Sequence, residues 1–151
     1  MKSNFLKSVC TLGPIGYFPA SGTFATIFCL PIIFGLSFLL SGVCYLMVAS
    51  FVTILSLASI HFSLSFFHEK DPSEIVIDEV AGIFLTFIFI KITFWNLILG
   101  AVLFRFFDIF KPLGIKIFER IPGSVGIWLD DVVAGFYSSI LLLFIIFFTN
   151  V

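Results

Sequence analysis

Charged side chains are scarce in this sequence, and the basic ones never form a run. The 151 residues include 8 Lys or Arg and 9 Asp or Glu, which is only 11% of the chain, and the formal net charge is −1. Nucleic-acid-binding domains usually carry a cluster of Lys and Arg on one face. The sequence therefore predicts no nucleic-acid partner.

The chain also lacks any cysteine motif. Cys10, Cys29 and Cys44 are far apart, they form no CxxC pair, and no histidine lies near them at a ligand spacing. We expect neither a disulfide nor a zinc site, and we expect Cys29 and Cys44 to pack as small hydrophobic side chains. Residues 11–16 are interrupted by Gly and Pro, so they do not resemble the apolar core of a cleavable signal peptide.

Apolar residues are in excess. Hydrophobic side chains make up 60% of the chain, and 23 residues are Phe, whereas a soluble domain is about 45–50% apolar. Water cannot accommodate so much apolar surface, so the sequence predicts an all-α, multi-pass membrane helical bundle. Its length predicts that this bundle is a single domain over residues 1–151. Four apolar segments are expected to enter the membrane: 24–40, 43–67, 75–107 and 132–148.

The third apolar segment is interrupted by polar residues between Lys91 and Asn96. We interpret it as a short helical hairpin with arms at 78–91 and 94–108. Each arm would rise only about 20 Å, whereas the hydrocarbon core of a bilayer is about 30 Å thick. The hairpin is therefore expected to stop short of one membrane surface.

Basic residues predict the orientation in the membrane. Lys91 is the only one expected on the far side, and the others precede the first span or lie in the loops 68–79 and 105–131. Because cytoplasmic loops carry an excess of Lys and Arg, the N-terminus and these two loops are expected in the cytoplasm and the C-terminus outside. This orientation places every acidic residue on the cytoplasmic side.

Seven charged residues are predicted to meet where three helices reach that side. One acidic pair lies at the start of the first hairpin arm. Three charged residues, spaced three positions apart, lie at the end of the second arm, and a second acidic pair lies at the start of the last span. Because the hairpin arms are nearly equal in length, these groups return to the same depth. The seven residues are Asp78, Glu79, Arg105, Asp108, Lys111, Asp130 and Asp131.

This group of residues suggests metal and phosphate chemistry. Clustered carboxylates at membrane depth are costly unless a cation neutralises them, and oxygen ligands select a hard ion such as Mg²⁺. The predicted ligands of one or two Mg²⁺ ions are Asp78, Glu79, Asp108, Asp130 and Asp131. Arg105 and Lys111 are the predicted phosphate-binding cations, and the predicted catalytic residues are Asp78, Asp108, Asp131, Arg105 and Lys111.

Simpler explanations exist for several of these residues. Asp130 could cap a helix N-terminus, Lys111 could complement a helix dipole, and Arg105 could form an ion pair with Asp108. The dipole does not explain Asp108, because an acid is unfavourable near a helix C-terminus. Small residues follow both acidic pairs, at Ala81-Gly82 and Ala134-Gly135, and would let two helices approach closely or leave room for a ligand.

Two weaker candidates lie nearby in the predicted topology. Residues 19–23 open the first span, and the backbone N–H groups at Gly22 and Thr23 could bind phosphate or simply start a helix. His61, Ser65 and His68 recur at helical spacing and could turn a polar face towards the site.

Three segments resemble the signature blocks of the phosphatidylglycerophosphatase A family: DPSEIVIDEVAG at 71–82, FRFFDIFKP at 104–112 and GIWLDDVVAG at 126–135. The resemblance spans nearly the whole chain, with the blocks in the same order. Two departures are the sequence SGTFAT at 21–26, where the family usually has Pro-Gly-Thr followed by Gly-Ser, and Gly123-Ser124 in place of Gly-Gly. Both are conservative, so we expect activity to survive.

The resemblance implies Mg²⁺-dependent hydrolysis of phosphatidylglycerophosphate, a phospholipid, to phosphatidylglycerol and phosphate. It also implies a site facing the cytoplasm in the bacterial cytoplasmic (inner) membrane, and a bundle with one central helix ringed by others. We expect direct attack by a metal-activated water, with an aspartyl-phosphate on Asp78 or Asp131 as the alternative. Rival functions are another lipid-headgroup phosphotransferase, or a divalent-cation transporter.

Overall fold

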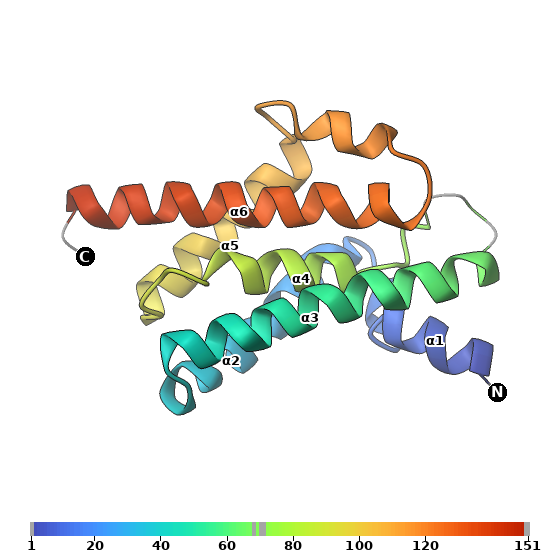
Figure 1. The fold of residues 1–151 in the computed structure, drawn as a ribbon, viewed down its shortest axis with the longest axis horizontal. Helices are drawn as coiled ribbons and strands as arrows, with labels where there is room; N and C mark the ends of the chain where they lie inside the picture. The colour runs from blue at the N-terminus through green and yellow to red at the C-terminus, as the bar shows by residue number, and fades with distance from the viewer. Residues whose placement is uncertain (1, 68, 70–71, 150–151) are drawn as a thin grey trace.

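The computed structural model describes residues 2–67, 69 and 72–149, and these residues form helices, turns and loops without a strand (Figure 1). In chain order the elements are α1 (Lys2–Cys10), the 3-10 helix η1 (Ile15–Tyr17), α2 (Ser21–Leu39), α3 (Gly42–Ser63), η2 (Leu64–Phe66), α4 (Ile77–Thr86), α5 (Phe94–Phe110), η3 (Ile115–Arg120) and α6 (Ser124–Thr149).

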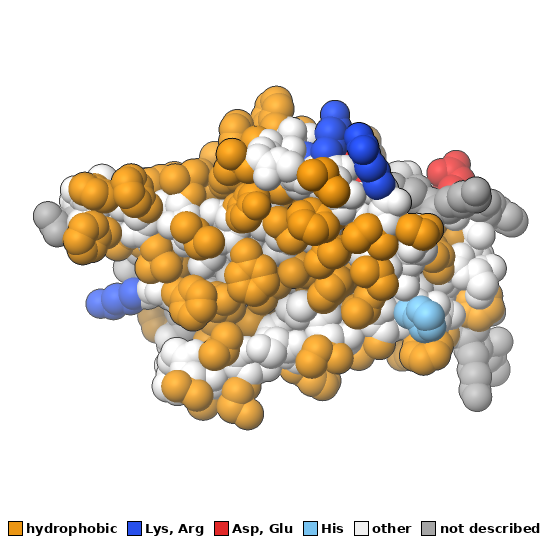
Figure 2. Space-filling model, turned by 45° about the horizontal axis from the view of Figure 1, so that its top comes forward, with side chains coloured by type: hydrophobic (Ala, Val, Ile, Leu, Met, Phe, Trp, Pro, Cys, Tyr) orange, Lys and Arg blue, Asp and Glu red, His pale blue; other side chains and the backbone are white. Residues whose placement is uncertain are grey.

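Three of the described helices are long and apolar enough to cross a membrane. They are α2 with 19 residues, α3 continued by η2 with 25, and α6 with 26, and their mean hydropathy is 2.0 to 2.3. Large apolar side chains cover their outer faces (Figure 2). Apolar surface of this extent is suited to lipid rather than water. The prediction of an all-α, multi-pass membrane bundle is confirmed.

Helix α4 lies at the centre of the bundle, in contact with α2, α3, α5 and α6 (Figure 1). Every α4 residue except Glu79 is buried, which is why the helix has no polar stripe. The Tyr45 hydroxyl of α3 donates to the Phe84 carbonyl oxygen at 3.1 Å. With 10 residues, α4 is only about 15 Å long. The expected short hairpin and central helix are therefore present.

The first arm of the hairpin is nevertheless shorter than predicted. Helix α4 ends at Thr86, and the amides of Phe87, Ile88 and Ile90 donate to carbonyls three residues earlier, forming tight turns. The alternating β-branched residues after Phe87 have low helix propensity. The Thr93 hydroxyl then accepts from the Asn96 amide at 3.2 Å and caps α5.

Helix α6 begins earlier than the apolar pattern indicates. The pattern places its start at Val132, but the helix starts at Ser124, directly after Gly123, whose φ is +81°. The apolar run marks where the side chains become continuously hydrophobic, and it misses two earlier turns in which apolar residues are mixed with Ser, Gly and the two aspartates. Asp130 and Asp131 consequently lie inside α6, so Asp130 is not its N-cap.

The N-terminal helix α1 was not predicted. It packs against α3, where the Cys10 sulfur lies 2.9 Å from the Ser63 hydroxyl, and the Cys10 carbonyl accepts from the Val76 amide at 2.9 Å. Cys29 is buried as expected, whereas Cys44 is exposed on α3, so its expected packing is wrong. Cys44 lies near the start of a lipid-facing helix, where an apolar segment does not imply burial within the protein.

The two ends of the bundle differ in charge. The end where α4 and α6 begin also holds the α3–α4 connection and the end of α5 (Figure 1). The opposite end holds the C-terminus and the α2–α3 and α4–α5 turns. Lys91, which is exposed, lies in the α4–α5 turn. The other charged groups that the structure describes therefore gather at one end, as the predicted topology requires.

Candidate functional site

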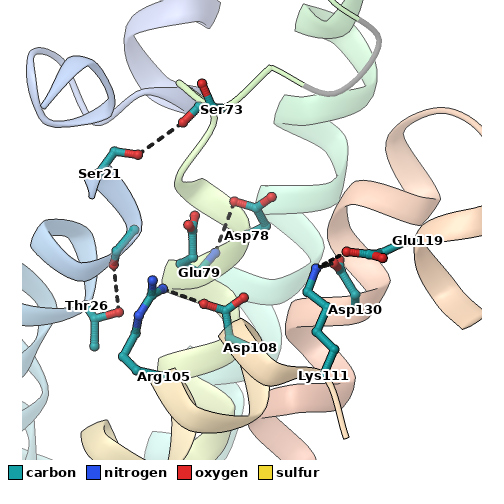
Figure 3. Close-up of polar contacts among 11 residues, drawn as sticks. Ser21, Thr26, Ser73, Asp78, Glu79, Arg105, Asp108, Lys111, Glu119 and Asp130 are labelled. Atoms are coloured by element: carbon teal, nitrogen blue, oxygen red, sulfur yellow. Dashed lines mark hydrogen bonds and ion pairs between the residues drawn. The ribbon is translucent and has the colours of Figure 1, made fainter. Parts of the chain in front are cut away.

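A cavity of about 1280 Å³ opens at the charged end of the bundle. It is bounded by the starts of α2, α4 and α6, the end of α5, η3 and the α3–α4 connection (Figure 3). All seven charged residues selected from the sequence line it. So does every acidic residue in the part of the chain that the structure describes: Glu69, Glu74, Asp78, Glu79, Asp108, Glu119, Asp130 and Asp131.

Three of these carboxylates lie close to one another. Asp78, Glu79 and Asp131 each place one carboxylate oxygen within 4.8 Å of the other two. The Asp78 side chain also accepts from the Glu79 amide at 3.1 Å. Asp78 and Asp131 are only 5% exposed. Three close carboxylates shielded from water repel one another strongly, so the geometry is suited to binding a positive ion.

The convergence depends on two glycines. A Cβ on Gly135 of α6 would collide with the carbonyl oxygen of Gly82 of α4, and a Cβ on Gly82 would lie 2.7 Å from the Asp131 carbonyl oxygen. Gly82 is one turn after Asp78, and Gly135 is one turn after Asp131. The close approach of α4 and α6 at this point therefore brings the two aspartates together, as the small residues predicted.

Arg105 and Asp108 form an ion pair on the wall of the cavity next to Glu79. Their Nη1 and Oδ2 atoms are 2.5 Å apart, so this part of the simpler explanation is confirmed. Gly22, at the start of α2, lies against this wall, because a Cβ there would collide with Glu79 Oε1 and lie 2.8 Å from Arg105 Nη1. The Arg105 Nε atom is buried and makes no hydrogen bond with the residues that the structure describes.

Besides the carboxylate cluster and the Arg105–Asp108 pair, the cavity contains Lys111 with two carboxylate partners. Its Nζ lies 2.5 Å from Asp130 Oδ2 and 2.6 Å from Glu119 Oε1 (Figure 3). Burial lowers the pKa of Lys111, but its bonds to the two carboxylates raise it more, so the pKa lies above its usual value. The ammonium group therefore stays charged at neutral pH.

The donor set fits a hard divalent cation such as Mg²⁺. Glu79 Oε2 and Asp130 Oδ1 are buried and make no hydrogen bond within the described part of the chain. A buried carboxylate oxygen without a donor is costly, and a cation would remove that cost. All the candidate ligands are oxygens, which Mg²⁺ prefers. Of the five predicted ligands, Asp78, Glu79 and Asp131 form the cluster, whereas Asp108 and Asp130 contact basic side chains.

Of the weaker candidates from the sequence, some line the cavity and others do not. Gly22 and Ser65 line the cavity, but Thr23 is not among the lining residues. The His61 ring is exposed, and its Nδ1 lies 3.3 Å from the Ser124 hydroxyl, linking α3 to α6. His68 lies outside the described residues.

Sequence reasoning missed the contribution of Glu119. This residue reaches Lys111 from η3, a 3-10 helix that carries no apolar periodicity. The α3–α4 connection was also missed as a wall of the cavity. It is held to α2 by the Ser21 hydroxyl, which donates to the Ser73 carbonyl at 3.1 Å (Figure 3). The only signal for Glu119 was its position in a loop already predicted to be on the same side.

Fold and site together define an integral membrane protein of helical-bundle type, with an acidic cavity holding two basic side chains at one membrane face. The family model of phosphatidylglycerophosphatase A matches residues 8–146. The chain therefore belongs to the phosphatidylglycerophosphatase A family, and the resemblance inferred from the three sequence blocks is confirmed.

Three curated relatives match shorter parts of the chain. A Bacteroides thetaiotaomicron protein provisionally named a phosphatidylinositol-3-phosphatase is 42% identical over 76 residues, 48% of each chain. The phosphatidylglycerophosphatase A of Haemophilus influenzae is 44% identical over 72 residues, 46% of this chain and 44% of the relative. That of Escherichia coli is 39% identical over 77 residues, 50% of this chain and 45% of the relative. The matches thus span about half the length of these relatives, and no solved structure matches the chain significantly.

Proposed function

We propose that the protein is a lipid phosphatase that hydrolyses the terminal phosphomonoester of phosphatidylglycerophosphate, giving phosphatidylglycerol and inorganic phosphate. Family membership and the names of two relatives support this activity. The observation that carries the proposal is the cavity in which every described acidic side chain meets Arg105 and Lys111. Such a cavity can bind a cation and a phosphate group next to each other, as metal-assisted phosphoester hydrolysis requires.

The residues of the site have distinct proposed roles. Arg105 and Lys111 bind the non-bridging phosphate oxygens and offset their charge. The first backbone N–H groups of α2 lack partners inside the helix, and Gly22 lies next to Arg105, so this helix start can contribute to phosphate binding. The water oxygen forms a bond to phosphorus as a site carboxylate accepts its proton. The bond from phosphorus to the glycerol oxygen breaks, and this oxygen takes up a proton to leave as the alcohol.

We propose Mg²⁺ as the cofactor, with Asp78, Glu79 and Asp131 as its ligands. Asp108 and Asp130 would orient Arg105 and Lys111 through the observed ion pairs. When bound, the ion would supply positive charge beside the phosphoryl group and favour deprotonation of water. The proposed location is the bacterial cytoplasmic (inner) membrane with the cavity facing the cytoplasm, supported by the excess of Lys and Arg at that end.

Metal removal is the direct test of this proposal. Purified protein in detergent micelles should release phosphate from phosphatidylglycerophosphate with Mg²⁺, and EDTA should reduce the rate by at least about a hundredfold, since a Lewis-acid ion contributes several kcal/mol. Added Mg²⁺ should restore the rate. Full activity in EDTA would contradict the metal assignment, and no phosphate release under any condition would contradict the phosphatase assignment.

Assays on the same purified protein distinguish a phosphatase from a phosphotransferase and from a cation transporter. The name of the Bacteroides relative favours phosphatidylinositol 3-phosphate as a second lipid phosphomonoester to assay alongside. A phosphotransferase would transfer a headgroup from a second substrate, such as a nucleotide-linked lipid, instead of releasing phosphate. A cation transporter would move Mg²⁺ into liposomes without hydrolysis. The gathering of the described carboxylates in one cavity at one end, rather than along a path across the bundle, supports the enzyme over the transporter.

A further inference from the structure

Lys111 makes contacts with two carboxylates of the protein itself. Its Nζ lies 2.5 Å from Asp130 Oδ2 and 2.6 Å from Glu119 Oε1, and Figure 3 shows both carboxylates on the same side of the ammonium group. Two negative charges at this distance offset the single positive charge of Lys111. A phosphate group that binds Lys111 must therefore compete with them.

The carboxylates of Asp130 and Glu119 differ in how easily they can separate from Lys111. The Asp130 side chain is only 9% exposed and lies within the long helix α6. The Glu119 side chain is 41% exposed and lies on η3, outside the three candidate membrane spans. An exposed carboxylate regains water when it leaves an ion pair, whereas a buried one pays a desolvation cost. Glu119 is therefore the partner that an incoming phosphate can displace.

We propose that Glu119 is a positioning residue that holds Lys111 while the cavity contains no phosphate and is displaced when a phosphate oxygen binds. The exchange transfers one N–H donor of Lys111 from the Glu119 carboxylate to the phosphate, with no covalent bond made or broken. A phosphomonoester carries about 1.5 to 2 negative charges, more than the carboxylate it replaces. The inference rests on the proposed function, because Lys111 is a phosphate ligand only there.

Displacement of Glu119 has a consequence for affinity. Part of the binding free energy of the phosphate is spent in separating Glu119 from Lys111, so Glu119 weakens binding of both substrate and product phosphate. When product leaves, Glu119 returns to Lys111 and opposes rebinding. Glu119 thus favours phosphate release.

The test compares Glu119→Gln with Glu69→Gln. Glu69 also places a carboxylate in the cavity lining, but within the described structure it forms no ion pair or hydrogen bond with Lys111. In Glu119→Gln, the KM for phosphatidylglycerophosphate and the inhibition constant of inorganic phosphate should both fall by about twofold to tenfold. The kcat should not rise in parallel. Glu119→Asp, which keeps the charge, should restore part of the wild-type KM.

Three outcomes would overturn the proposal. An unchanged or higher KM in Glu119→Gln would mean that Glu119 only supports the fold or helps Lys111 bind phosphate. An equal fall in Glu69→Gln would mean that the cavity's overall charge is responsible. Titration calorimetry with inorganic phosphate and Mg²⁺ tests the exchange without turnover. Equal affinities for wild type and Glu119→Gln would contradict the inference, whereas failure of wild type to hydrolyse the lipid would contradict the proposed function instead.

Discussion

Replacing Asp131 with asparagine is expected to abolish phosphate release while the helical bundle stays folded. Asp131 is buried beside Asp78 and Glu79 in the carboxylate cluster, and a neutral amide is a poorer ligand and proton acceptor than a carboxylate. We expect kcat to fall by on the order of 10² to 10⁴, and Asp78→Asn should have a similar effect. The measurement is phosphate release from phosphatidylglycerophosphate at saturating Mg²⁺.

Thermal unfolding distinguishes a lost ligand from a damaged fold. Without Mg²⁺, Asp131→Asn should unfold at a temperature no lower than wild type, because one of three repelling charges is gone. Mg²⁺ should raise the unfolding temperature of wild type by binding the native state, and this increase should shrink in the variant. Glu69→Gln, outside the cluster, is the matched control. Near wild-type rates in both aspartate variants would contradict the site assignment.

The sequence predicts the main helices well, because lipid imposes a simple rule on them. Apolar segments long enough to cross the membrane must be helices with their backbone groups satisfied internally, and α2 and α3 meet this rule on either side of Ser41. The site was also predictable in outline. Scarce charges at the ends of three predicted helices, the two hairpin arms and the last span, had to lie at one membrane face, and all seven of them line one cavity.

The Arg105–Asp108 ion pair followed from its spacing of three residues on one helix, but the other pairings of those charges were not predictable, because packing decides them. The sequence offers all five carboxylates as metal ligands, but the fold places Asp130 against Lys111, a residue 19 positions away. With Asp108 paired to Arg105, the carboxylates Asp78, Glu79 and Asp131 remain as the cluster. Adjacent residues of α6 point in different directions around the helix, which separates Asp130 from Asp131. The helical turns before Val132 were missed because their apolar residues are interrupted by Gly126 and the two aspartates, and Glu119 was missed because no apolar periodicity marks η3.

A single methyl group added at Gly135, outside the cavity lining, is expected to reduce the proposed phosphatase activity strongly. Because a Cβ there would collide with the Gly82 carbonyl oxygen, Gly135→Ala must push α4 and α6 apart one turn from Asp78 and Asp131. A displacement of about 1 Å at a reacting centre can cost about 10²-fold in rate, and overpacking costs about 1–3 kcal/mol of stability. We expect kcat to fall about 10²-fold, measured alongside the unfolding temperature.

Gly35→Ala is the matched control for this prediction. It makes the same change within helix α2, at a position where no other atom lies within 4 Å of the new Cβ. Alanine is the better helix former by about 1 kcal/mol, so this variant should keep its activity and unfold no earlier than wild type. If Gly135→Ala bound Mg²⁺ and turned over substrate as wild type does, the α4–α6 contact would not control the carboxylate cluster. If Mg²⁺ stabilised Gly35→Ala but not Gly135→Ala, the result would show that the spacing of α4 and α6 determines the spacing of the carboxylates.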